Sequence, residues 1–167
     1  MTKEMIRIAN CSGFYGDKLS VAKDMVEGGP IDVLTGDYLA ELTMTILYNQ
    51  KIKRGEDHGY VGTFLKQFKD VAKSTQEKNI KIVSNAGGLN PKAMALEVEK
   101  IIDELNLKLK VAYIEGEDWI PEFQKLSEAG EKFKNLDNEI NLSDYPKKPI
   151  TANAYLGAWG IKEALDN

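Results

Sequence analysis

The sequence has very few of the residues that build disulfides, zinc centres and nucleophile–histidine pairs. It contains one cysteine, Cys11, and one histidine, His58. A single cysteine excludes an intrachain disulfide and favours a reducing compartment, so we expect a cytoplasmic protein. One cysteine and one histidine are too few for a typical zinc site. Because His58 lies in a charged loop that we expect to be remote, a Cys–His catalytic pair is disfavoured, and Cys11 is expected to be a buried, unreactive thiol.

Long apolar runs and an excess of positive charge are also missing. No run approaches the ~18 residues of a membrane-spanning helix, and the first ten residues do not have the pattern of a signal peptide. Lysine and arginine number 22 against 26 acidic residues, which gives a net charge of −4, whereas a nucleic-acid-binding domain usually carries a basic stripe. We therefore expect neither a membrane nor a nucleic acid as a partner.

The chain alternates short apolar runs with longer amphipathic segments. Residues 5–9, 31–34, 80–83 and 109–114 have the composition of strands, and the segments between them have helical periodicity. Further helices are expected at 121–129 and from about 153 to 165, with a polar surface excursion at 132–149. Strands separated by helices form right-handed βαβ units. The sequence thus predicts a single α/β domain over 1–167, with a mainly parallel, Rossmann-like sheet of about four to five strands and helices on both faces.

Small and polar residues follow all four predicted strands. Ligands of open parallel sheets bind outside the carboxyl ends of the strands, so we expect Asp37 and Asn85 to position or move a proton there. The expected ligand-binding residues at these ends are Asn10, Ser12, Gly13, Asp17, Thr35, Ser84, Gly87, Gly88, Asn90 and Glu115.

Asp37 has two other interpretations. It can cap the helix that follows the second strand, or it can join Glu115, Glu117 or Asp118 in holding Mg²⁺ through oxygen ligands. A solvated acidic loop is the more frequent meaning of such a run, so no metal site is predicted. The sequence also assigns no cofactor.

Residues 84–91 are the most informative stretch. Gly87 and Gly88 allow close approach of a ligand or positive φ, and Asn90 and Pro91 mark the start of a helix. Free N–H groups and the helix dipole at that point favour a carboxylate or a phosphate. The alternative is a tight strand-to-helix turn with nothing bound. The stretch is neither GxGxxG nor a Walker loop, which disfavours a standard nucleotide site.

Four motifs carry a resemblance to a known family. They are SGFYGD at 12–17, TGDYLAELTM at 35–44, VSNAGGLNP at 83–91 and ANAYLGA at 152–158. Together, in this order, they resemble the N-terminal region of the acyclic terpene utilisation (AtuA-like) family. The resemblance implies a role in acyclic terpene or branched acyl catabolism, with no established catalytic residues, and its fourth motif adds Asn153 to the expected ligand-binding residues.

The resemblance also bears on partners. Relatives continue past the position of Leu165, so we expect either a fragment or one half of a longer protein. An uncovered sheet edge invites association, which favours self-association or a complementary C-terminal subunit. The leading hypothesis is a domain that binds a small anionic metabolite (an acyl group, a carboxylate or an acyl-CoA), with or without catalysis. The alternative is a non-catalytic subunit that completes a larger hetero-oligomeric complex.

Overall fold

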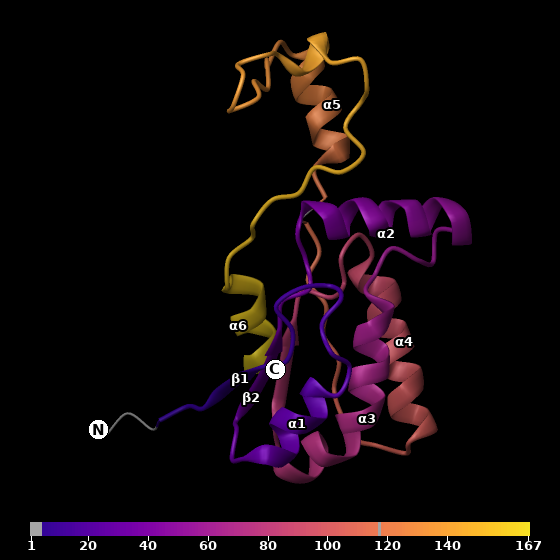
Figure 1. Ribbon diagram of the computed structural model, residues 1–167, viewed down its shortest axis with the longest axis vertical. Helices are drawn as coiled ribbons and strands as arrows, with labels where there is room; N and C mark the ends of the chain where they lie inside the picture. The colour runs from indigo at the N-terminus through magenta and orange to yellow at the C-terminus, as the bar shows by residue number, and fades with distance from the viewer. Residues whose placement is uncertain (1–4, 117) are drawn as a thin grey trace.

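The computed structural model describes residues 5–116 and 118–167, and strands and helices alternate along it (Figure 1). This confirms a mixed α/β fold. None of its described helices is both long enough and apolar enough to cross a bilayer. The elements in chain order are β1 (Ile8–Asn10), α1 (Val21–Gly28), β2 (Val33–Gly36), α2 (Glu41–Arg54), α3 (Gly62–Lys78), β3 (Lys81–Ser84), α4 (Pro91–Glu104), α5 (Ile120–Glu128), the short 3-10 helix η1 (Leu142–Asp144) and α6 (Trp159–Asp166).

The three strands form one parallel sheet in the order β1-β2-β3. The register places Ala9, Leu34 and Ile82 in one row across the sheet. Because neighbouring strands are also consecutive in the chain, right-handed crossovers carry their helices to the same face. The described strands therefore contain no reversal of order of the kind that marks a doubly wound sheet, and the Rossmann-like topology stays a prediction.

The face with Leu34 carries the apolar core. Val26 of α1 and Val71 of α3 pack there in one cluster with Leu34. A second cluster joins α2, α3 and α4 through side chains such as Leu47 and Phe68. The opposite face is much less covered, since Ile8 keeps 66% of its surface exposed. Only α6, among the described helices, lines a hollow on that face, so helices lie on both sides in unequal number.

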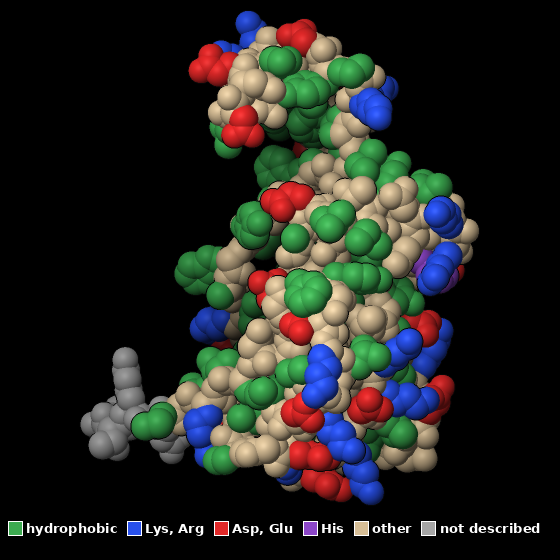
Figure 2. All heavy atoms as spheres, viewed as in Figure 1, with side chains coloured by type: hydrophobic (Ala, Val, Ile, Leu, Met, Phe, Trp, Pro, Cys, Tyr) green, Lys and Arg blue, Asp and Glu red, His purple; other side chains and the backbone are tan. Residues whose placement is uncertain are grey.

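Residues 118–153, which we call the arm, project away from the body (Figure 1). An antiparallel bridge between Asp118 and Asn153 closes its base, and the Phe123 and Phe133 rings lie 4.2 Å apart within it. No residue of the arm is buried, and Figure 2 shows it as a separate lobe with hydrophobic side chains on the visible surface. The arm thus includes the surface excursion expected at 132–149.

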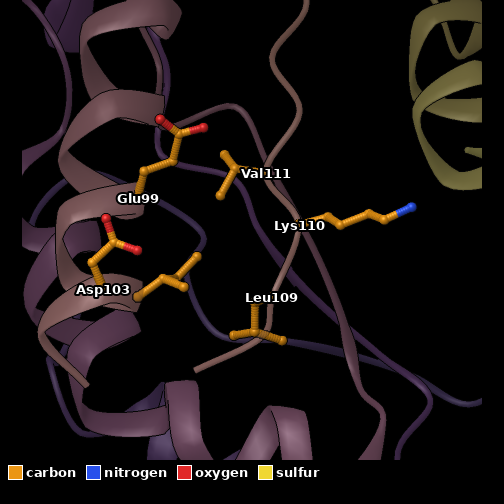
Figure 3. Close-up of a pocket in the computed structure, with 6 residues that line it drawn as sticks. Glu99, Asp103, Leu109, Lys110 and Val111 are labelled. Atoms are coloured by element: carbon orange, nitrogen blue, oxygen red, sulfur yellow. The ribbon is translucent and has the colours of Figure 1, made fainter. Parts of the chain in front are cut away.

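The described part of the chain has three strands, fewer than predicted, because residues 109–114 pair with no strand. Their side chains still alternate as in a strand: Leu109 and Val111 line a hollow beside α4, and the Lys110 side chain points to the other side (Figure 3). The two apolar side chains pack against the core, while Lys110 Nζ donates to the backbone oxygen of Asn167 over 2.7 Å. The expectation of a fourth strand at 109–114 is therefore not met by the sheet, because an apolar pattern can place side chains against the core without supplying a hydrogen-bonding partner for the backbone.

Candidate functional site

The carboxyl ends of the three strands surround a hollow of about 230 Å³. Each strand contributes the residues at its end, and α6 closes one side. The lining residues are Asn10, Thr35, Gly36, Asp37, Val83, Ser84, Asn85 and Ile161. Typical ligand pockets measure roughly 300–1,000 Å³, so this hollow is suited to a small ligand or to one end of a larger one.

Asp37 and Asn85, the two residues expected to handle a proton, touch each other at the rim of the hollow. Asn85 Nδ2 donates to Asp37 Oδ1 over 2.6 Å. Asn85 Oδ1 accepts from the backbone N–H of Tyr38 over 2.8 Å. Since one end of the amide donates and the other accepts, these two bonds fix its orientation. Residues 48 positions apart in the chain are thereby joined.

Asp37 does not cap α2. That helix begins at Glu41, and Ala40 occupies the position before it. The Asp37 side chain is exposed, and a carboxylate has about four lone-pair sites. The contact with Asn85 occupies one oxygen, so the carboxylate keeps acceptor sites for a ligand.

The other polar side chains of the lining make bonds to the strands and loops beside them. The Thr35 hydroxyl donates to Asn10 Oδ1 over 3.1 Å, and Asn10 Nδ2 donates to the backbone oxygen of Ser12 over 2.9 Å. The Ser84 hydroxyl donates to Gly36 O over 3.2 Å and accepts from the Ala86 N–H over 3.0 Å. An asparagine amide has two N–H donors, so the side chain of Asn10, like that of Asn85, retains one for a ligand.

The loop after β1 is closed on itself. The Ser12 hydroxyl is buried and donates to Phe14 O over 2.9 Å. The Asp17 carboxylate accepts from the backbone N–H of Gly13 and that of Lys18 over 2.9 and 3.0 Å, and these bonds lower the pKa of Asp17. Ser12, Gly13 and Asp17 were expected to bind a ligand, but they are not among the residues that line the hollow.

The loop after β3 uses its own amides. The N–H of Gly88 bonds to Asn85 O, that of Leu89 to Gly59 O and that of Asn90 to Gly87 O, at 2.8–3.2 Å. These three amides are therefore not free to bind the carboxylate or phosphate that the sequence led us to expect. The arrangement matches the alternative interpretation, a tight strand-to-helix turn.

The glycines and the asparagine of this loop have structural roles. A Cβ on Gly87 would lie 2.8 Å from Pro91 Cα, and Gly88 has a φ of +56°. Asn90 caps α4, since its Oδ1 accepts from the Ala93 N–H over 3.1 Å, and its Nδ2 donates to Glu56 O over 2.8 Å. Packing and capping account for Gly87, Gly88 and Asn90, and none of the three lines the hollow.

The acidic run after residue 114 does not join Asp37. Glu115 is exposed, and Asp118 pairs with Asn153 at the base of the arm. Glu117, which was considered with them for Mg²⁺, lies outside the described residues. Within residues 5–116 and 118–167, no three acidic, cysteine or histidine side chains gather closely enough to hold a metal ion.

Cys11 is a buried thiol beneath the strand ends. Its Sγ lies 3.7 Å from the hydroxyl of Tyr38, and burial raises the pKa of the thiol. The Tyr38 hydroxyl donates to Gln67 Oε1 over 2.5 Å, and burial raises the pKa of Tyr38 far above its usual range. A protonated, enclosed thiol is a poor nucleophile, which agrees with the inert role predicted for Cys11.

A second, larger hollow of about 430 Å³ lies between α4 and residues 109–111 (Figure 3). Glu99 and Asp103 of α4 are exposed beside its apolar floor. It collects no groups from the strand ends, where ligands of parallel sheets bind. We therefore take the smaller hollow as the candidate site.

Comparison with known families now adds to this geometry. The family described as "Acyclic terpene utilisation family protein AtuA" matches residues 6–167. The chain belongs to the AtuA family. Membership confirms the resemblance carried by the four motifs and suggests a role in acyclic terpene utilisation. No curated protein and no solved structure matches the chain.

Three lining residues of this AtuA-family chain were not predicted: Gly36, Val83 and Ile161. The first two stand at the ends of β2 and β3, so their place at the strand ends was a usable signal. A Cβ on Gly36 would lie 2.6 Å from the Tyr38 ring, which explains why glycine fits there. Ile161 reaches the hollow because α6 returns to the sparsely covered face, and no local sequence pattern signals that return.

Proposed function

We propose that this AtuA-family chain binds a small acyl-type metabolite (an acyl group, a carboxylate or an acyl-CoA) in the hollow at the strand ends, within acyclic terpene or branched acyl catabolism. The observation that carries the proposal is the contact of Asp37 with Asn85 on the lining of that hollow. Two polar side chains from different strand ends, of which Asn85 is also held by the Tyr38 N–H, are the arrangement that small-molecule sites use to fix a ligand.

Each part of the lining has a role in this proposal. The remaining N–H donors of Asn10 and Asn85 bind an acyl oxygen, and Asp37 positions a proton-bearing group or accepts its proton. Val83 and Ile161 supply apolar surface for the carbon chain. A hollow of about 230 Å³ takes the acyl part alone, so the remainder of an acyl-CoA lies outside it.

A thermal-shift screen tests the proposal. Short branched acyl-CoAs, the corresponding acids, nucleotides and divalent ions are added separately to the full chain, and the melting temperature is recorded. An acyl ligand is expected to raise the melting temperature of the wild type and to have little effect on Asn85→Ala or Asp37→Ala. Asp118→Ala, which removes a carboxylate from the base of the arm, is the matched control and retains the shift. No stabilisation by any acyl compound contradicts the proposal.

The arm favours a second candidate function, that of a subunit in a larger assembly. Its 36 positions contain no buried residue, and Leu136 is 99% exposed. Such a segment gains little from its own packing to offset the entropy of ordering it. We propose that the arm packs against a second copy of the chain. Light scattering is expected to show an oligomer, and Leu136→Ser is expected to weaken it. Ile52→Ser changes an exposed site on α2 outside the arm and is expected to leave the oligomer intact. A concentration-independent monomer contradicts it.

A further inference from the structure

The described lining of the strand-end hollow carries a negative charge and no positive charge. Asp37 is the one charged side chain among its eight described residues, and none of them is basic. Lys162 follows Ile161 in α6, but its ammonium group is paired with Asp166. A ligand in this hollow therefore meets a carboxylate, neutral amides and hydroxyls, and apolar side chains.

This composition is unfavourable for a free carboxylate. Two carboxylates that share a small site repel each other, and one of them must take up a proton to relieve the repulsion. Sites that bind carboxylates usually supply an arginine, a lysine or several backbone N–H groups. The hollow lacks such a cation among its described lining residues, and the Gly88, Leu89 and Asn90 amides of the neighbouring loop are already bonded within the protein.

An uncharged oxygen group fits the same lining well. A hydroxyl can donate to Asp37 and accept from the remaining N–H of Asn85 or Asn10. An ester or thioester carbonyl can accept from both amides without bringing a charge. The apolar surfaces of Val83 and Ile161 then face the aliphatic chain.

We propose that the hollow selects a hydroxyl or an ester-type carbonyl on a short aliphatic chain and rejects the corresponding free carboxylate, with Asp37 as the residue that sets this specificity. This inference rests on the proposed function, because it names the ligand class of the same site.

A pair of probes with one carbon skeleton tests the inference. Binding of 3-methylbutan-1-ol and of 3-methylbutanoate to the full chain is measured at pH 7 by NMR titration. The alcohol is expected to bind at least tenfold more tightly than the carboxylate. Asp37→Asn removes the charge and preserves the side-chain shape, so the preference is expected to shrink at least tenfold, mainly because the carboxylate binds better. Asp17→Asn is the matched control, since Asp17 does not line the hollow, and it retains the preference.

The outcomes separate this inference from the proposed function. Tighter binding of 3-methylbutanoate to the wild type overturns the inference and leaves an acyl site in place. A preference for the alcohol that Asp37→Asn does not change also overturns it, because the selectivity then has another source. If an acyl-CoA stabilises the protein in the thermal-shift screen and 3-methylbutan-1-ol does not bind in the titration, the hydroxyl part of the inference is wrong. If neither probe binds and no acyl compound of the screen stabilises the protein, both proposals fail.

Discussion

Replacing Asn85 with aspartate puts a second carboxylate against Asp37 without changing the shape of the side chain. In the wild type Asn85 Nδ2 donates to Asp37 Oδ1 over 2.6 Å. The variant Asn85→Asp replaces that donor with a charged oxygen. Its other oxygen can still accept from the Tyr38 N–H, which Asn85 Oδ1 does over 2.8 Å in the wild type, so the effect comes from the contact with Asp37 alone.

The size of the effect follows from the distance. Two unit charges 2.6 Å apart repel by about 1.6 kcal/mol in water, which is the appropriate dielectric because both side chains are exposed. The lost hydrogen bond adds roughly 1 kcal/mol, the net contribution of a typical hydrogen bond, because water also solvates these exposed groups. We therefore expect Asn85→Asp to lower the free energy of unfolding by about 2–3 kcal/mol at pH 7.

The pH dependence gives the sharper test. The repulsion favours protonation of one carboxylate in the folded variant, so the pKa of the pair is raised above its value in the unfolded chain. The variant therefore shows its full loss of stability above the raised pKa of the folded state. The loss becomes small once the pH falls to the unfolded carboxyl pKa of about 4. Urea denaturation followed by circular dichroism is expected to show a deficit that falls below about 1 kcal/mol at pH 4.

The double variant Asn85→Asp with Asp37→Asn is the matched control. It moves the single charge to the other side of the contact and restores one donor facing one acceptor. It is expected to recover more than half of the lost stability, and the double-mutant cycle isolates the coupling between the two residues. A small, pH-independent effect of Asn85→Asp, or no recovery in the double variant, would show that the two side chains do not interact.

Three further predictions concern the frame around the site. Gly88→Ala is expected to cost about 2–4 kcal/mol in urea denaturation, because its Cβ would meet Leu47 at a φ of +56°; wild-type stability would contradict this. Arg7 lowers the pKa of Asp32 to about 2, so their ion pair stabilises the fold above about pH 4 and loses its effect as the pH falls toward 2; Asp32→Asn should remove this part of the acid transition. Cys11, being buried, should react with a thiol reagent only upon unfolding; rapid reaction of the native protein would refute the buried placement.

The sequence predicted the elements more accurately than their boundaries. The first strand was expected at 5–9 and is observed at Ile8–Asn10, and the second was expected at 31–34 and is observed at Val33–Gly36. Apolar composition marks where a strand is buried, whereas strand bounds depend on which residues find hydrogen-bonding partners. The same distinction explains residues 109–114, which are packed against the core but unpaired.

The site shows a similar division. Five of the thirteen predicted site residues line the hollow, namely Asn10, Thr35, Asp37, Ser84 and Asn85. All five lie within one residue of the last residue of a strand. Residues farther along the loops, such as Ser12 and Asn90, bond to their own neighbours instead. A polar loop residue looks the same in sequence whether its hydrogen-bonding groups serve the turn or a ligand.

By itself the sequence determined the alternation of strands and helices, the parallel sheet and the gathering of polar residues at its carboxyl edge, because periodicity and turn chemistry are local properties. The tertiary structure decided which of these residues meet. The hydrogen bond between Asp37 and Asn85 depends on the register of β2 against β3, and the place of Ile161 depends on the return of α6 to the open face of the sheet. Both arise from packing between segments far apart in the chain, which no local pattern encodes.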